Sequence, residues 1–460
     1  MKRHKNKSVL VLGLGETGLS MVRWLSDQSA LLRVADTRSA PPRLAEVSKY
    51  VSGDQIFCGS FNDALFDGIE LIAISPGVPL LDPVVARAVA RGIEVVGDIE
   101  LFAQSLPQEN RPRILAITGS NGKTTVTSMV EHLCKAAGGD VVAAGNISPA
   151  VLDVVLERGV NQPEVWVLEL SSFQLETTSN LNADAATVLN ISEDHLDRYA
   201  DIDEYSAAKA RIFSGCNVQV LNRDDERSMG MARAECKTIT FGLSEPGSAS
   251  DFGIEQADGE IWLKQGKKRL IKASELQVAG LHNVANALAA LALSRAIDFP
   301  MPVLLDALRS FKGLPHRVER VATISGVTYF DDSKGTNVGA TVAALQGLGC
   351  KAVLIAGGEG KGQDFAPLNP AVARHARAVV LIGRDAPLIE NALNGTGVKM
   401  VRARDMNDAV QQAAQLAQSG DAVLLSPACA SFDMFRNYEH RAEAFVEAVG
   451  ELKLEGAWLH

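Results

Sequence analysis

Residues 114–136 leave few choices for the fold of this chain. The apolar residues 114–117 predict a buried strand, a glycine-rich turn follows, and residues 125–136 predict a helix. This order gathers backbone N–H groups and a helix N-terminus around one point, which suits an anion. Lys123 adds a positive charge there, and Thr124 offers a hydroxyl to Mg²⁺. The segment predicts a nucleoside triphosphate cradle, although Ile117 stands where the standard P-loop has its first glycine.

Short apolar segments alternate with helical ones along most of the 460 residues. Further strands are expected at residues 9–12, 31–35, 71–74, 165–168, 186–189, 327–330, 352–356, 378–382 and 422–425. Further helices are expected at residues 17–27, 83–91, 204–213, 285–296, 406–418 and from about 439 onward. This alternation predicts the α/β class with doubly wound sheets. Residues 218–270 favour short strands instead, with a hairpin at Asp258-Gly259.

Two proline-containing linkers divide the chain, one at residues 104–113 and one at residues 311–315. The expected domains are 1–103, 104–313 and 314–460. The first and third are expected to be Rossmann-like, and the second to be a P-loop-like ATPase domain.

Composition excludes several classes of protein. The net charge of −10 argues against a general nucleic-acid-binding protein, because phosphate binding needs a basic surface. None of the six cysteines is spaced as C-x-x-C, so neither a zinc ribbon nor a disulfide framework is expected. No apolar run is long enough to span a bilayer, and the start of the chain is not a convincing signal peptide. We expect a cytoplasmic protein that does not insert into membranes.

The first unit carries a second glycine-rich turn. The pattern G-x-G-x-x-G occupies residues 13–18 after the first strand, and Asp36 ends the second strand. This arrangement resembles the dinucleotide fingerprint with its ribose-binding acid, and it indicates a diphosphate site more firmly than it indicates NAD. A turn used only for close packing and an NAD-dependent oxidoreductase remain alternatives. Residues 75–78 form another loop at the end of a strand of the same sheet, where such sheets bind ligands.

Polar residues at strand ends supply further candidates. Glu169 ends an otherwise apolar strand and suits Mg²⁺, which takes carboxylate and phosphate oxygens. His195 lies among acids in residues 190–198, which favours a ligand or substrate role. Lys209, judged by helical spacing alone, reads as a surface lysine. In the third unit the loops 331–337, 357–362 and 426–433 follow three strands, and together they predict a site for an anionic small molecule with Lys334 and Lys361 as counter-charges.

Seven segments together resemble the Mur ligases, the ATP-dependent amino-acid ligases of peptidoglycan precursor synthesis. They are residues 118–125, 169–175, 190–198, 280–286, 313–317, 332–337 and 425–431. The resemblance covers nearly the whole chain and is strongest to the members that add D-glutamate to UDP-N-acetylmuramoyl-L-alanine. It implies ligation driven by ATP, through an acyl phosphate and a tetrahedral intermediate. Alternatives are L-glutamate as the added amino acid, another Mur or folylpolyglutamate-type ligase, and a non-catalytic UDP-sugar sensor. A monomer is expected.

The resemblance also implies roles for individual residues. The UDP end of the sugar nucleotide would contact Glu16, Thr17, Gly18, Asp36, Thr37, Arg38, Ser75 and Gly77, and the muramoyl end would contact Asn146. The ATP phosphates would lie on Gly119, Ser120, Asn121, Gly122, Lys123, Thr124 and Thr125. The remainder of ATP would contact Asn283, Asn286, Arg317 and Asp332.

Two Mg²⁺ sites are implied as well, one at Thr124 and Glu169 and one at His195 and Lys209, with Lys209 carbamylated by CO₂. Burial would favour the neutral amine that this reaction needs. The implied catalytic set is Lys123, Glu169, His195, Lys209 and Arg317, and His195 would also meet the substrate. Glutamate would lie among Lys334, Thr336, Lys361 and Ser431, with Tyr438 where a phenylalanine is usual.

Overall fold

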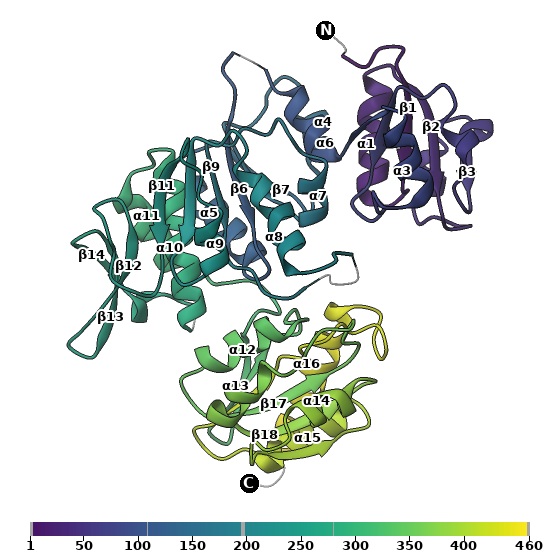
Figure 1. The fold of residues 1–460 in the computed structure, drawn as a ribbon. Helices are drawn as coiled ribbons and strands as arrows, with labels where there is room; N and C mark the ends of the chain where they lie inside the picture. Colours follow the sequence, from purple (N-terminus) through teal and green to yellow (C-terminus); the bar gives the residue numbers. More distant parts are fainter. Residues whose placement is uncertain (1–2, 108, 195–197, 279, 458–460) are drawn as a thin grey trace.

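The computed structural model describes residues 3–107, 109–194, 198–278 and 280–457. Three bodies follow one another along the chain, each built on a mainly parallel sheet with helices packed against it (Figure 1). The expected ranges 1–103, 104–313 and 314–460 each contain one of these sheets, and helix α4 (Asp98–Ser105) lies across the first boundary. Among the described residues, no helix is both long and apolar enough to cross a membrane.

The N-terminal sheet has the strand order β3-β2-β1-β4-β5. Its strands are β1 (Ser8–Leu12), β2 (Leu31–Asp36), β3 (Ile56–Cys58), β4 (Leu71–Ile74) and β5 (Glu94–Val96). Its helices are α1 (Glu16–Asp27), α2 (Leu44–Val47) and α3 (Pro83–Ala90). The chain order reverses between β1 and β4, so a crevice opens at the carboxyl ends of these two strands.

The central sheet has the order β11-β10-β9-β6-β8-β7. Its strands are β6 (Arg113–Thr118), β7 (Val141–Gly145), β8 (Val165–Glu169), β9 (Ala185–Val188), β10 (Val218–Asn222) and β11 (Lys237–Phe241). Its helices include α5 (Lys123–Ala136), α6 (Val151–Arg158), α7 (Ser172–Glu176), α8 (Ile202–Ala210), α9 (Glu226–Gly230), α10 (Leu281–Ala296) and α11 (Met301–Ser310). The antiparallel strands β12 (Phe252–Ala257), β13 (Glu260–Gln265) and β14 (Lys268–Lys272) form a small separate sheet, and the expected hairpin joins β12 to β13.

Alternating residues of β6 face two different cores. Ile114 and Ala116 belong to one apolar cluster, and Leu115 and Ile117 belong to another with α5, α10 and α11. This alternation explains why the strand reads as an unbroken apolar run, since both of its faces are buried.

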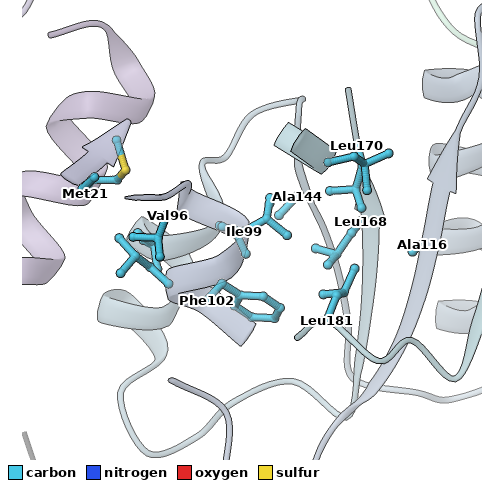
Figure 2. Close-up of a cluster of buried hydrophobic side chains, with 14 of the residues drawn as sticks. Met21, Val96, Ile99, Phe102, Ala116, Ala144, Leu168, Leu170 and Leu181 are labelled. Atoms are coloured by element: carbon cyan, nitrogen blue, oxygen red, sulfur yellow. The ribbon is translucent and has the colours of Figure 1, made fainter. Parts of the chain in front are cut away.

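The first of these clusters runs on into the N-terminal body. Figure 2 shows Met21 of α1 on one side of it, Phe102 of α4 in the middle and Leu168 of β8 on the other side. The N-terminal and central bodies therefore share a continuous apolar core, with α4 between them.

The C-terminal sheet has the order β15-β16-β20-β17-β18-β19. Its strands are β15 (Glu319–Ile324), β16 (Val327–Asp331), β17 (Ala352–Gly357), β18 (Ala376–Ile382), β19 (Lys399–Arg402) and β20 (Ala422–Leu425). Its helices are α12 (Val338–Gly347), α13 (Leu368–His375), α14 (Ala386–Ala392), α15 (Met406–Leu416) and α16 (Tyr438–Ala457). Only β15 runs antiparallel to its neighbour. The two apolar clusters of this body hold residues of this body alone.

Candidate active site

The turn between β6 and α5 has the backbone that an anion cradle needs. Gly119 has φ +151° and Gly122 has φ +83°, which side-chain-bearing residues rarely adopt, and the helix begins at Lys123. The expected start at residue 125 was two residues too late, because this first turn is already helical. The Lys123 Nζ donates to the carbonyls of Gly119 at 2.8 Å and Ser120 at 2.9 Å, which folds the side chain back over the turn.

Arg317 reaches this turn from the start of the C-terminal body, just before β15. Its Nη2 donates to the Thr124 hydroxyl at 3.2 Å. Its Nε is buried and has no hydrogen-bond partner among the residues the structure describes. Burial lowers the pKa of Arg317, and the nearby carboxylates of Asp332 and Glu169 oppose that shift. The site thus gathers two cations, Lys123 and Arg317, from different bodies of the protein.

Glu169 has one carboxylate oxygen that can still bind a cation. The residue ends β8 beside β6 and is 2% exposed. Its Oε1 accepts a hydrogen bond from the Asn146 amide at 2.9 Å, while its buried Oε2 lacks a partner within the described ranges. An unpaired buried carboxylate oxygen is unfavourable unless a cation binds it. Together with the Thr124 hydroxyl, this donor set fits Mg²⁺, which prefers oxygen ligands.

Lys209 is not a surface residue, so the interpretation from helical spacing was wrong. It is 1% exposed, and its Nζ donates to the Gly119 carbonyl at 3.0 Å and lies 4.6 Å from the centre of the Tyr205 ring. Burial, with a further contribution from the charge of Lys123, holds the pKa of Lys209 well below its ordinary value. The amine is therefore biased toward its neutral form. His195, expected near it, lies outside the described residues.

A cavity of about 930 Å³ opens at the switch point of the N-terminal sheet. Seven of the eight residues expected at the UDP end line it, and so does Asn146; these are Glu16, Thr17, Asp36, Thr37, Arg38, Ser75, Gly77 and Asn146. Gly18 does not line it. A Cβ at that position would lie 1.8 Å from the Gly13 carbonyl oxygen, so Gly18 allows α1 to pack tightly on the turn.

The charges in this cavity are already paired. Arg38 donates to both carboxylate oxygens of Asp36, at 2.8 and 2.6 Å, and the Leu14 N–H donates to the same carboxylate at 2.7 Å. Although burial acts in the opposite direction, these hydrogen bonds lower the pKa of Asp36 to about 2. Glu16 forms an ion pair with Arg43. The Arg38 side chain remains half exposed, so it can still meet a ligand.

A second cavity lies where the central and C-terminal bodies meet. Asn121, Gly122 and Thr125 of the phosphate turn line it, together with four residues expected to bind the remainder of ATP, which are Asn283, Asn286, Arg317 and Asp332. His282 and residues of α12 also line it. Asp332 accepts a hydrogen bond from the Ser426 hydroxyl at 2.6 Å. Burial raises the pKa of Asp332 to about 7, against that hydrogen bond and the charge of Arg317.

The loops expected to hold glutamate lie at the carboxyl end of the C-terminal sheet. Lys334 Nζ donates to the Tyr438 hydroxyl at 3.3 Å, and burial lowers the pKa of Lys334. Ser431 is buried and Thr336 is half-buried. Lys361 is exposed with φ +51°, in the loop whose Glu359 forms a bridge with Ala430. These residues share one edge of one sheet, and among the described members of the group only Lys334 and Tyr438 are joined by a side-chain hydrogen bond.

Comparison with known proteins decides the family. Three family models match successive parts of the chain: the MurD-like N-terminal domain of Mur ligases at residues 7–97, the Mur ligase middle domain at residues 117–294, and the Mur ligase glutamate ligase domain at residues 316–429. The chain belongs to the Mur ligase family. This result disfavours the oxidoreductase alternative, because the family members named below are ligases.

Curated relatives match this Mur ligase over almost its full length. The UDP-N-acetylmuramoylalanine–D-glutamate ligase of Nitrosomonas europaea is 58% identical over 455 residues, which covers 97% of this chain and 96% of that protein. The protein of the same name from Methylobacillus flagellatus is 58% identical over 453 residues, which covers 98% of this chain and 99% of that protein.

Solved structures share the three-domain fold of this Mur ligase. The MurF ligase of Thermotoga maritima in complex with ADP has a TM-score of 0.60 at 17% identity, covering 99% of this chain and 96% of that one. MurF from Acinetobacter baumannii has a TM-score of 0.61 at 16% identity, and the match covers 97% of this chain and 92% of that one.

The structure also brings forward residues of this Mur ligase that the sequence analysis did not single out. Asn190 braces the phosphate turn, because its Oδ1 accepts from the Asn121 N–H at 2.8 Å. Tyr205 lies beneath the Lys209 amine. His282 lines the cavity beside Asn283. Asn190 and His282 fall inside motif segments and could have been found there, whereas Tyr205 carries no signal beyond its spacing of four residues from Lys209 on one helix face.

Proposed function

We propose that this Mur ligase uses ATP to join the amino group of D-glutamate to the alanyl carboxylate of UDP-N-acetylmuramoyl-L-alanine. The observation that carries the proposal is the contact between Arg317 and Thr124, which places the C-terminal body against a phosphate turn with Lys123 and Glu169 beside it. The curated relatives that bear this activity in their names span nearly the whole chain.

The N-terminal cavity supports a sugar nucleotide whose reacting end points at the phosphate turn. The cavity extends from Arg38 to Asn146. The Asn146 amide donates to Glu169, which lies in the strand next to β6. A nucleotide held near Arg38 would therefore lead its acyl end past Asn146 toward the ATP phosphates.

The first chemical step brings two anions together. The alanyl carboxylate attacks the γ-phosphate, which yields an acyl phosphate and ADP. Lys123 and Arg317 offset the repulsion between these groups. Burial lowers the pKa of both cations, and the negative charge of Glu169 opposes that shift. Mg²⁺ bound by Thr124 and Glu169 would add positive charge on the phosphate oxygens.

The second step makes the amide bond. The glutamate amine attacks the acyl carbon, and phosphate leaves from the tetrahedral intermediate. We propose that Lys334, Thr336, Lys361, Ser431 and Tyr438 surround the amino acid. Two lysines suit the two carboxylates of glutamate, and the Tyr438 hydroxyl already holds Lys334 in place.

We propose further that Lys209 carries a carbamate formed with CO₂. Its lowered pKa favours the neutral amine that can attack CO₂. The product is an anion next to the phosphate turn, where it would hold a second Mg²⁺ together with His195. We also propose that the enzyme acts as a monomer and, because its substrates are nucleotides, in the cytoplasm.

The function is tested by measuring phosphate release with UDP-N-acetylmuramoyl-L-alanine and Mg-ATP, with each amino acid added in turn. We expect release that depends on D-glutamate and is accompanied by the amide product. Release with L-glutamate instead would replace the proposed amino acid. Release with neither isomer would overturn the proposal, and turnover of a folate in their place would favour the folylpolyglutamate-type alternative.

Replacing Arg38 with alanine should raise the KM for the sugar nucleotide about tenfold, as loss of one charge-assisted hydrogen bond does. The KM for ATP should stay unchanged, because Arg38 lies in the N-terminal cavity. Initial rates with each substrate varied separately measure both constants. Arg87→Ala is the matched control, since Arg87 is 54% exposed against 53% for Arg38 and also pairs with an aspartate. An equal rise in both variants would contradict the assignment.

A further inference from the structure

The first turn of α12 in the C-terminal body rests on the phosphate turn of the central body. Asn337 caps α12, because its Oδ1 accepts from the Ala340 N–H at 2.9 Å. Its Nδ2 donates to the Oδ1 of Asn121 at 3.0 Å, across 216 residues of sequence. One side chain thus begins a helix in one body and binds the phosphate turn in another.

The approach is close enough to need a glycine. A Cβ at Gly339 would lie 3.0 Å from the Asn121 Nδ2 and 3.1 Å from the Ser192 Oγ. Such distances are tighter than ordinary van der Waals contact, so a methyl group there would crowd the Asn121 and Ser192 side chains and strain the contact between α12 and the turn. Gly339 therefore allows α12 to dock closely beside Asn337.

Asn121 is held rigidly from the other side. Its backbone N–H donates to the Asn190 Oδ1 at 2.8 Å, and its carbonyl accepts from the Asn190 Nδ2 at 3.1 Å. Its Nδ2 donates to the Ser192 Oγ at 3.3 Å. The Asn121 Oδ1 is thus directed at the C-terminal body by groups of the central body, and Asn337 meets a fixed acceptor.

The loop that ends in Asn337 also carries the residues proposed to meet both reactants. Asp332, Lys334 and Thr336 lie between β16 and α12. The loop is compact, since the Gly335 N–H donates to the Asp332 carbonyl at 2.8 Å and the Thr336 N–H donates to the Lys334 carbonyl at 3.0 Å. Fixing Asn337 on Asn121 therefore fixes the proposed glutamate residues relative to the phosphate turn.

We propose that Asn337 is a positioning residue that couples the amino-acid loop to the phosphate turn through Asn121. With the pair formed, the glutamate amine lies ready when the acyl phosphate forms. With the pair broken, the C-terminal loop is misplaced, and water attacks the acyl phosphate in place of the amine and returns the free carboxylate and phosphate. This inference rests on the proposed function.

The test uses the full-length enzyme with two substitutions that leave the helix intact. Asn337→Ser keeps an N-cap oxygen of equal quality but is too short to reach Asn121. Gly339→Ala keeps both asparagines and places a methyl group in the contact, while alanine is the better helix former. Asn407→Ser is the matched control, because Asn407 is exposed in the same body and its side chain donates to Glu451, far from the phosphate turn.

We expect the KM for glutamate to rise about fivefold in Asn337→Ser, as for loss of one hydrogen bond, and further in Gly339→Ala. In both, the ratio of phosphate released to amide formed should exceed the wild-type ratio, while Tm stays within about two degrees of wild type. Asn407→Ser should match wild type in all three measurements.

Two results would overturn the inference while the proposed function stands. One is wild-type KM and wild-type product ratio in both variants. The other is a lowered Tm with unchanged KM and product ratio, which is the result for a purely structural cap. Failure of the wild-type enzyme to form the amide would instead contradict the proposed function. Failure of the proposed function and failure of the role given to Asn337 are therefore distinguishable.

Discussion

Alanine in place of Lys123 should lower kcat by at least about 100-fold, the usual loss when one preorganised transition-state donor is removed. The Nζ of Lys123 lies over the phosphate turn, bonded to two of its carbonyls. Phosphoryl transfer to a carboxylate brings negative groups together, and the alanine variant has one cation fewer to offset that repulsion. ADP release at saturating concentrations of all three substrates measures the effect.

Lys135→Ala provides the control for this experiment. Lys135 lies in the last turn of the same helix, is 55% exposed and pairs with Glu131. Its loss should leave kcat within about twofold of wild type, because exposed ion pairs contribute little. Near-normal turnover in Lys123→Ala would refute the role given to Lys123.

The Lys209→Ala enzyme should also lose about 100-fold or more in kcat, and added acetate or formate should restore part of it. The substitution removes the amine proposed to carry the carbamate and leaves a space beside Gly119 and Tyr205. A small carboxylate can enter that space and supply the missing anion. Initial rates across a range of acetate concentrations measure the rescue, with chloride at equal ionic strength as the reference.

Lys209→Met distinguishes loss of the amine from loss of side-chain packing. Methionine fills most of the volume of the buried lysine, so this variant should remain folded, lose activity as Lys209→Ala does, and gain nothing from acetate. Isotopically labelled bicarbonate should give a carbamate carbon signal in wild-type enzyme and none in Lys209→Met. An unimpaired Lys209→Ala enzyme, or the same signal in both proteins, would remove the carbamate from the mechanism.

The central strands could be predicted because nearly all of their residues are apolar. β4 and β20 match their expected bounds, since runs of buried apolar residues stop at polar turns. The edge strands β7, β15 and β19 were not expected. β15 is partly exposed along its whole length and pairs antiparallel at the edge of the sheet, so nothing in its sequence separates it from a loop.

The site residues likewise include some that the sequence predicts and some that it does not. Glu169 could be predicted because a single acid ends an apolar strand, and its burial follows from the sheet. Lys209 could not be predicted by spacing, because alanines flank it on both sides and α8 has no clear apolar stripe. Its burial is decided by the phosphate turn, which lies about 90 residues earlier in the chain. The contact between Asn337 and Asn121 likewise depends on how two bodies meet, which no local pattern encodes.

The apolar core that runs through α4 gives the three bodies unequal freedom. Parting the N-terminal and central bodies would expose Met21, Phe102 and their neighbours to water, at a large cost in free energy. In the part of the chain that the structure describes, the apolar clusters of the C-terminal body contain no residues of the other two bodies. This body contacts the phosphate turn through hydrogen bonds such as those of Arg317 and Asn337, and water can replace such hydrogen bonds when the bodies separate. We therefore expect the C-terminal body to swing away when the products leave, while the N-terminal and central bodies stay packed together.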